Sequence, residues 1–144
     1  MTDYPTIPSG AIDAIVYGHH GDPFSILGPH AVENGIVIRM FLPSAREVHV
    51  LWPDQSLSQP MVRIRDGLYE LFVGDIELPT DYRFHVITYD NDVLTLEDPY
   101  NFPTQISEFD EHLMIEGNHF QMYEKMGAHL MEVNGRSGVI FAVW

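Results

Sequence analysis

Metal binding is the first chemistry that the residue types allow, because the chain has eight histidines and imidazole is a common ligand of divalent transition metals. They are His19, His20, His30, His49, His85, His112, His119 and His129. No His-Glu-x-x-His spacing, which would place two ligands on one helix face, occurs among them. His19 and His20 would point to opposite sides of a strand, and His49 and His85 fall in expected surface strands. We therefore expect surface histidines, with no metal site and no cofactor.

The sequence also contains no motif that is typical of covalent or acid–base catalysis. The chain has no cysteine, no Gly-x-Ser-x-Gly elbow and no Gly-rich phosphate loop. Glycosyl transfer needs two carboxylates about 5 Å apart in a shaped cleft, and 21 acidic residues make chance pairs certain. The acids fall in expected turns, such as Asp66 and Asp90, or on an expected helix, such as Asp110. We expect no catalytic residue.

Carbohydrate binding is the remaining chemistry, because the flat faces of sugars stack on aromatic rings. The candidates in or beside expected strands are Trp52, Tyr69, Tyr82 and Tyr89. The alternative is that alternating aromatic residues pack the core or cover a sheet face. The sequence leaves both interpretations open for each of the four.

The charge of the chain excludes several partners. The net charge is −14, and no Lys or Arg occurs between Phe84 and Glu124. Nucleic acid or an anionic membrane would be repelled, whereas a neutral sugar would not. The first residues do not resemble a signal peptide, and no apolar run approaches the ~18 residues of a membrane span. We expect a cytoplasmic protein without disulfides.

The elements that would position these residues are mainly strands. Alternating apolar residues predict strands over 35–43, 47–53, 60–65, 68–73, 82–89 and 93–98. Tight turns are expected at Asp66-Gly67 and across 90–92. This spacing predicts a mainly β fold, an antiparallel immunoglobulin-like β-sandwich with short flanking helices.

Two short helices and a hairpin complete the pattern. Ser9 is expected to cap a helix that ends at Gly18, followed by a loop over 19–30 that inserts apolar side chains into a core. A second helix is expected from Ser107, with Asp110 in capping-box position, to Gly117. Residues 131–144 carry a hairpin signal at Asn134-Gly135.

Several of these segments together resemble the N-terminal part of bacterial 1,4-α-glucan (glycogen) branching enzymes. The pieces are "HHGDPFSILGPH", the Asp98-Pro99-Tyr100 turn, the Glu116-Gly117 helix end and "YEKMGAH", in that order. The likeness spans nearly all of residues 19–144. It departs from the family at Gly21, which interrupts the usual His-His-Asp-Pro-Phe.

The resemblance implies a domain layout. Residues 1–18 would be a lead-in with a short helix, 19–115 the N-terminal β-sandwich, and 116–144 a connector and the first strand of a following carbohydrate-binding domain. A catalytic barrel would lie beyond it. Residues 139–144 would then lack the other strands of their domain. We expect this run to be disordered or to be covered by the first domain or a neighbouring molecule.

The resemblance also implies a function. The parent enzyme would transfer α-1,4-glucan segments to 6-hydroxyls to form α-1,6 branches, and this domain would modulate chain-length transfer or hold glucan without catalysing. Glycogen or a maltooligosaccharide and the remaining domains of the parent would be its partners. Two alternatives stay open: a free-standing glycan-binding module and an immunoglobulin-like interaction domain.

Overall fold

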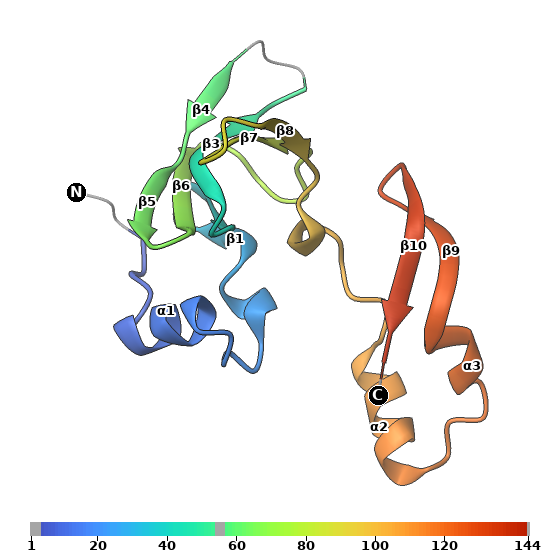
Figure 1. Cartoon of the computed structure of the whole chain (residues 1–144). Helices are drawn as coiled ribbons and strands as arrows, with labels where there is room; N and C mark the ends of the chain where they lie inside the picture. The colour runs from blue at the N-terminus through green and yellow to red at the C-terminus, as the bar shows by residue number, and fades with distance from the viewer. Residues whose placement is uncertain (1–3, 54–56, 144) are drawn as a thin grey trace. The chain divides into compact units, whose positions relative to one another are not determined.

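The computed structural model describes residues 4–53 and 57–143 (Figure 1). The chain divides into two compact units, Met1–Asn101 and Phe102–Trp144. No helix in the described part of the chain is long and apolar enough to cross a bilayer.

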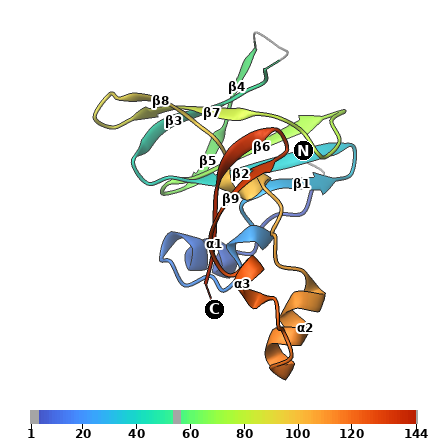
Figure 2. The same ribbon diagram turned by 90° about the vertical axis from the view of Figure 1, so that its right-hand side faces the viewer.

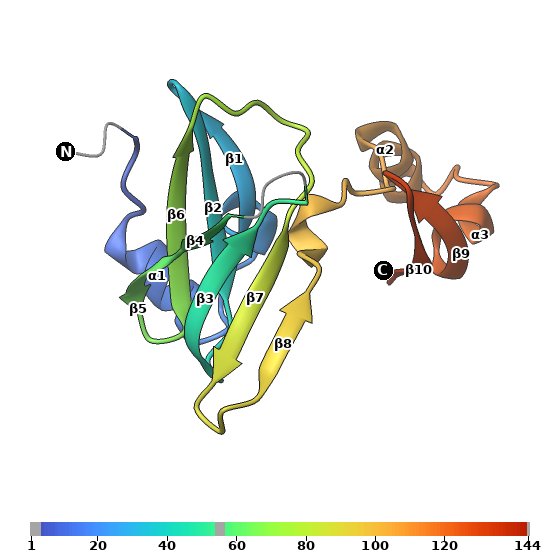
Figure 3. The same cartoon turned by 90° about the horizontal axis from the view of Figure 1, so that it is seen from above.

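The first unit is a sandwich of two antiparallel sheets, as the sequence predicts (Figure 3). In its described part, one four-stranded sheet has the order β1-β2-β6-β5, with β1 Gly28–Val32, β2 Gly35–Phe41, β6 Leu68–Gly74 and β5 Val62–Arg65. The other has the order β4-β3-β7-β8, with β4 Ser58–Pro60, β3 Ala45–Leu51, β7 Arg83–Thr88 and β8 Val93–Leu96.

Two strand predictions need correction. The loop expected over 19–30 contains the start of β1, which pairs with β2 along its whole length. The strand expected over 60–65 is divided, because Pro60 ends β4 on one sheet and Val62 begins β5 on the other. Met61, between them, is buried, and its backbone N–H donates to the carbonyl of Val48 at 2.9 Å. The chain therefore changes sheets at this residue.

The register of the strands builds the core between the sheets. In the first sheet Ile36 pairs with Val73 and Ile38 with Leu71, and both isoleucines are fully buried in the core. In the second sheet Val50 pairs with Phe84 in the same way. Since successive residues of a strand point to opposite faces, these pairs all enter one apolar layer.

The outer face of the first sheet is covered by the N-terminal segment. Helix α1 (Ser9–Val16) and the short 3-10 helix η1 (Pro23–Ser25) precede β1. Ile15 of α1 packs with Leu27 and Leu68 in a second buried cluster. Ser9 is not the cap that the sequence predicts, because Pro8 holds that position and no side-chain cap bond forms. Apolar docking, rather than capping, therefore holds this helix in place.

The second unit consists of two short helices and a hairpin (Figures 1 and 2). They are α2 (Glu108–Glu116), α3 (Met122–Lys125), β9 (Gly127–Val133) and β10 (Arg136–Ala142). The predicted helix from Ser107 to Gly117 is confirmed, with the capping box formed and Gly117 left-handed at φ 73°. The hairpin turns at Asn134 and Gly135, both with positive φ, as a two-residue turn of this type requires.

The final strand has a backbone partner. β10 pairs with β9 from Arg136 to Ala142, so residues 139–142 are neither disordered nor unpaired. The expectation for 139–144 was wrong on this point, because the turn at Asn134-Gly135 supplies the partner from within the same unit. Trp144 lies outside the described residues.

Candidate functional site

The four aromatic residues predicted to bind sugar lie in different environments. Trp52, Tyr69 and Tyr82 are buried, with exposed fractions of 7%, 2% and 1%. Tyr89 is 53% exposed and follows the last residue of β7. The structure thus brings Trp52 and Tyr82 together and leaves Tyr89 at the surface.

The three buried rings are engaged in the core. The Trp52 ring contacts Tyr82 edge-on at 5.8 Å between centroids, and its Nε1 donates to Gln59 Oε1 at 3.0 Å. The hydroxyl of Tyr69 donates to the carbonyl of Ala45 at 2.7 Å. A ring packed in this way has no free face on which a sugar could stack. Burial therefore argues against sugar stacking on Trp52, Tyr69 and Tyr82. Sugar binding by Tyr89 stays a prediction.

Tyr89 sits on an ordered turn between β7 and β8. Its backbone N–H donates to the carbonyl of Ser44 at 3.1 Å. The Thr88 hydroxyl accepts from the backbone N–H of Asp92 at 3.1 Å, and Arg46 donates to Asn91 Oδ1 at 2.7 Å. The turn therefore fixes the backbone of Tyr89 while its side chain remains accessible.

Tyr82 and Asp98 form a buried polar pair near the end of the first unit. Tyr82 donates its hydroxyl to Asp98 Oδ2 at 2.5 Å, and the backbone N–H of Tyr100 donates to Asp98 Oδ1 at 2.9 Å. Burial raises the pKa of Asp98 above its ordinary value, against the lowering effect of these hydrogen bonds. Burial also raises the pKa of Tyr82, and the neighbouring Asp98 carboxylate raises it further. The pair attaches the turn over 98–101 to Tyr82, the residue immediately before β7.

The same turn explains one glycine. Gly28 has φ +88°, and a Cβ at this position would lie 2.7 Å from Tyr100 Cβ. Only glycine accommodates both the left-handed backbone and the close approach of Tyr100. The Asp98-Pro99-Tyr100 segment, which the sequence offered as a family feature, thus has a structural role as the end of the sandwich.

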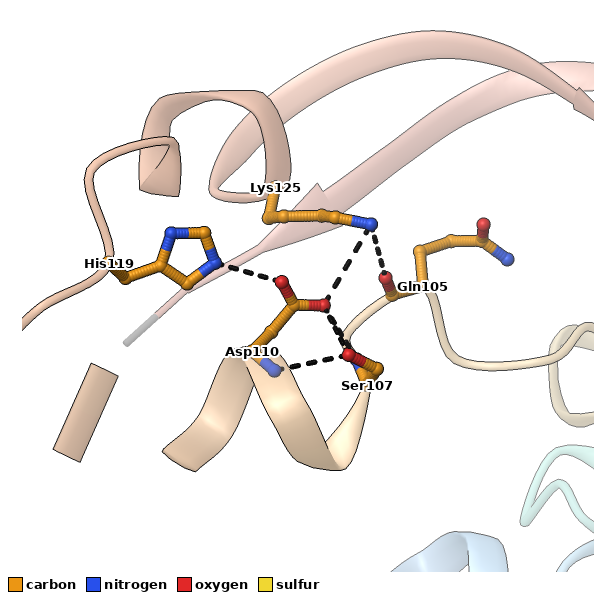
Figure 4. A network of polar contacts seen from close by, with 5 residues as sticks. All are labelled: Gln105, Ser107, Asp110, His119 and Lys125. Atoms are coloured by element: carbon orange, nitrogen blue, oxygen red, sulfur yellow. Dashed lines mark hydrogen bonds and ion pairs between the residues drawn. The ribbon is translucent and has the colours of Figure 1, made fainter. Parts of the chain in front are cut away.

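A second polar network lies within the second unit (Figure 4). The backbone N–H and the hydroxyl of Ser107 donate to Asp110 Oδ2 at 2.9 and 2.7 Å. His119 Nε2 lies 2.8 Å from Asp110 Oδ1. Lys125 Nζ lies 3.8 Å from Oδ2 and donates to the carbonyl of Gln105 at 3.3 Å. One carboxylate therefore joins the start of α2, the loop after it and the end of α3.

Sequence reasoning found only part of this network. The capping-box spacing identified Ser107 and Asp110, but no spacing rule links Asp110 to His119 or Lys125. The hydrogen bonds from Ser107 lower the pKa of Asp110 well below its ordinary range, and His119 lowers it further. A carboxylate held ionised by a helix cap is unsuited to act as a general acid. The network stabilises the unit.

The described residues contain no group of three or more His, Asp or Glu side chains placed to hold a metal ion. The outer face of the second sheet is the remaining surface with clustered chemistry. It carries Leu51, Ile87 and the half-buried histidines His49 and His85. This face and Tyr89 are two surface features in the described part of the first unit that could receive a ligand.

The comparison with protein families gives a direct match. The family model for the N-terminal domain of the α-1,4-glucan branching enzyme GlgB matches residues 8–100. This range ends one residue before the end of the first compact unit, Met1–Asn101. The match and the folded unit therefore coincide.

Curated relatives agree with the family match. The 1,4-alpha-glucan branching enzyme GlgB of Paramagnetospirillum magneticum is 43% identical over 96% of this chain and 18% of its own length. The enzyme of the same name from Bradyrhizobium sp. BTAi1 is 43% identical over 90% of this chain and 18% of its own length. The enzyme of the same name from Nostoc sp. PCC 7120 is 39% identical over 96% of this chain and 19% of its own length. The chain thus spans less than a fifth of these relatives.

Solved structures give weaker likenesses. A pullulanase from Paenibacillus barengoltzii is 23% identical over 61% of this chain and 16% of its own chain, with a TM-score of 0.46. PulA from Klebsiella pneumoniae is 23% identical over 51% of this chain and 8% of its own chain, with a TM-score of 0.45. At these scores the likeness carries no weight, and the sandwich assignment rests on the strand pairing.

Proposed function

The chain belongs to the family of N-terminal domains of the α-1,4-glucan branching enzyme GlgB, and from this premise we propose that it is a non-catalytic part of a longer, cytoplasmic glycogen branching enzyme. The longer enzyme would transfer α-1,4-glucan segments to 6-hydroxyls and so form α-1,6 branches. This part would modulate the length of the transferred chain or hold the glucan. The match over residues 8–100 is the observation that carries the proposal.

We further propose the domain layout that the resemblance implies: a lead-in over 1–18, the sandwich domain over 19–115, and, within 116–144, a connector and the first strand of a following carbohydrate-binding domain. The hairpin supports this layout. One of its faces carries Ala128, Leu130, Val139 and Phe141, with Leu130 87% and Phe141 75% exposed. An apolar sheet face left open in this way suits cover by further strands of a following domain.

The first experiment removes residues 1–101 from the longer enzyme. Branch formation should persist, while the length distribution of the transferred chains, measured by chromatography after enzymatic debranching, should change. Complete loss of branching in a folded deletion variant would contradict a non-catalytic role. An unchanged length distribution would contradict modulation. The 144-residue chain alone should form no branch points in amylose.

Glucan holding has its own test. The chain, labelled with nitrogen-15, is titrated with maltoheptaose, and the backbone amide shifts are followed. Shifts centred on Tyr89 are expected, and Tyr89→Ala should remove them. Tyr17→Ala is the matched control, because Tyr17 is a 66% exposed tyrosine elsewhere in the same unit. An absence of shifts up to millimolar ligand would contradict glucan holding by this segment.

The immunoglobulin-like interaction domain is the alternative with a distinct outcome. Such a domain would show no response to maltoheptaose, and its removal would leave the chain-length distribution unchanged. The free-standing glycan-binding module would respond to maltoheptaose without any covalent link to a barrel. The open apolar face of the hairpin favours neither, because a free-standing module would have no cover for it.

A further inference from the structure

The outer face of the second sheet brings together two histidines that are distant in the sequence. His49 on β3 and His85 on β7 are directly paired across the antiparallel ladder. Their ring centroids lie 6.3 Å apart and the ring planes are 83° to one another. Both residues are half-buried. This geometry presents two imidazoles on one side of a sheet.

We propose that His49 and His85 form a binding site for a divalent first-row transition metal ion, such as Zn²⁺ or Cu²⁺. Each imidazole would contribute one ring nitrogen, and water would complete the coordination. Metal–nitrogen distances of about 2.0–2.1 Å would place the two ring centroids at roughly 6 Å or less. The observed 6.3 Å between centroids is close to this upper value.

The ring nitrogens of this pair are available. In the described part of the chain, the histidines with polar contacts are His20, His30, His112, His119 and His129. His49 and His85 have no such contact among the described residues, so a metal ion would displace no hydrogen bond within the protein. Neutral imidazole nitrogen suits zinc, copper and nickel among the divalent ions.

The strands that carry the pair are firmly held. β3 and β7 are the two inner strands of their sheet, each paired on both sides. The residues beside the histidines, Val48, Val50, Phe84 and Val86, are almost fully buried on the opposite face. Directly opposed residues of an antiparallel pair keep their Cβ atoms about 4.5–5.5 Å apart. Pre-organisation of the two ligands therefore comes from the sandwich core.

The net charge of the chain favours a cation, and the charged side chains beside the pair are in ion pairs, Arg83 with Glu97 and Arg46 with Glu47. The chain carries a net charge of −14, which attracts divalent ions. Glu47 lies on the same face two residues before His49, but Arg46 holds its carboxylate at 3.4 Å. The remaining coordination positions would thus stay open to water or to a ligand from another molecule. This inference rests on the ladder geometry and does not depend on the proposed glucan function.

The test uses the full 144-residue chain and CuCl₂ as probe, because bound Cu²⁺ broadens nearby amide signals. One equivalent at pH 7.5 should broaden the amides of 48–50 and 84–86 first. His49→Gln and His85→Gln should each weaken binding at least tenfold. The matched control is the double variant His19→Gln/His20→Gln, which also removes two histidines and should bind within twofold of the wild type. Lowering the pH to 5.5 should weaken binding, because protons compete with the metal ion for the ligand nitrogens.

A second measurement uses ZnCl₂ and thermal unfolding. Zinc should raise the unfolding temperature of the wild type and of the control, but not of the double variant His49→Gln/His85→Gln. Circular dichroism checks that all variants are folded. Three results would overturn the site: undiminished binding in the double variant, broadening centred on His19 and His20, or no broadening around β3 and β7 at millimolar Cu²⁺.

Discussion

The two compact units of this chain are stabilised in different ways. The first unit buries an apolar layer between two sheets and a second apolar cluster under the N-terminal segment. In the described part of the second unit, Asp110 is the one residue classed as buried, while large apolar residues such as Phe109 and Leu130 are exposed. Hydrophobic burial therefore stabilises the first unit, whereas backbone pairing and one polar network hold the second. We expect the second unit to be the less stable of the two.

Truncation of a phenylalanine in each unit is the strongest test of this comparison. Phe84 is 1% exposed and packs edge-on against Tyr82. Phe84→Ala should lower the free energy of unfolding of the first unit by about 3–5 kcal/mol, because it leaves a cavity in the core. Chemical denaturation, followed by the fluorescence of buried Trp52, measures this change.

Phe141 supplies the matched control in the second unit. It is 75% exposed on the hairpin, so Phe141→Ala should change stability by no more than about 0.5 kcal/mol. A loss comparable to that of Phe84→Ala would mean that the hairpin face is covered in the chain, and the contrast between the units would fail.

Two glycines with left-handed backbones sharpen the comparison. Gly28 and Gly117 have similar φ values, 88° and 73°, but an added Cβ would meet Tyr100 at Gly28 and open space at Gly117. Gly117→Ala should cost about 1 kcal/mol from backbone strain alone. Gly28→Ala should cost about 2–3 kcal/mol, because the clash adds to the strain. Equal losses, measured by denaturation for Gly28 and by amide exchange of α2 for Gly117, would contradict the packing at Tyr100.

Acid should affect the units in opposite directions through one carboxyl group in each. Burial raises the pKa of Asp98, so its contribution to the first unit is fully present below the ordinary pKa of 3.8 and is lost as pH rises through the folded pKa. Hydrogen bonds from Ser107 lower the pKa of Asp110, so its contribution to the second unit is present above pH 3.8 and is lost as pH falls through the folded pKa.

Amide hydrogen exchange between pH 6 and pH 3, corrected for the intrinsic rate, measures both effects. Protection of α2 should fall on acidification relative to protection of β7. Asp110→Asn should remove the acid dependence in α2, and Asp98→Asn should remove the opposite dependence in β7. Identical pH profiles for both units in the wild type would contradict these assignments.

The fold could be predicted from sequence where the signal is local. Alternation in 35–43 and 82–89 predicted the strands that the structure has as β2 and β7, and the turn residues Asp66-Gly67 and Asn134-Gly135 marked hairpins. The short strand β1 was missed, because Gly28 and Pro29 normally interrupt strands and only the pairing with β2 establishes it. Sheet changes such as the one at Met61 depend on tertiary packing and leave no local pattern.

The candidate site residues were harder to predict, because their surroundings also depend on tertiary packing. Trp52, Tyr69 and Tyr82 have the residue types of a sugar platform, but alternation cannot tell which sheet face is covered. The contact between His49 and His85 joins two strands that are not consecutive in the chain, so no spacing rule could find it. The Asp110–His119 contact was missed in the same way.

The smallest expected effect compares two serines that the sequence predicts as helix caps. The Ser107 hydroxyl accepts from the backbone N–H of Asp110 at 3.1 Å, whereas Ser9 lies inside α1 and makes no cap bond. Ser107→Ala should destabilise α2 by about 1 kcal/mol, visible as roughly fivefold faster amide exchange. Ser9→Ala should leave α1 unchanged or slightly more stable, because alanine is the better helix former. Equal effects at both positions would mean that α2, like α1, is held by apolar docking, and the two units would then differ less than the burial of their side chains indicates.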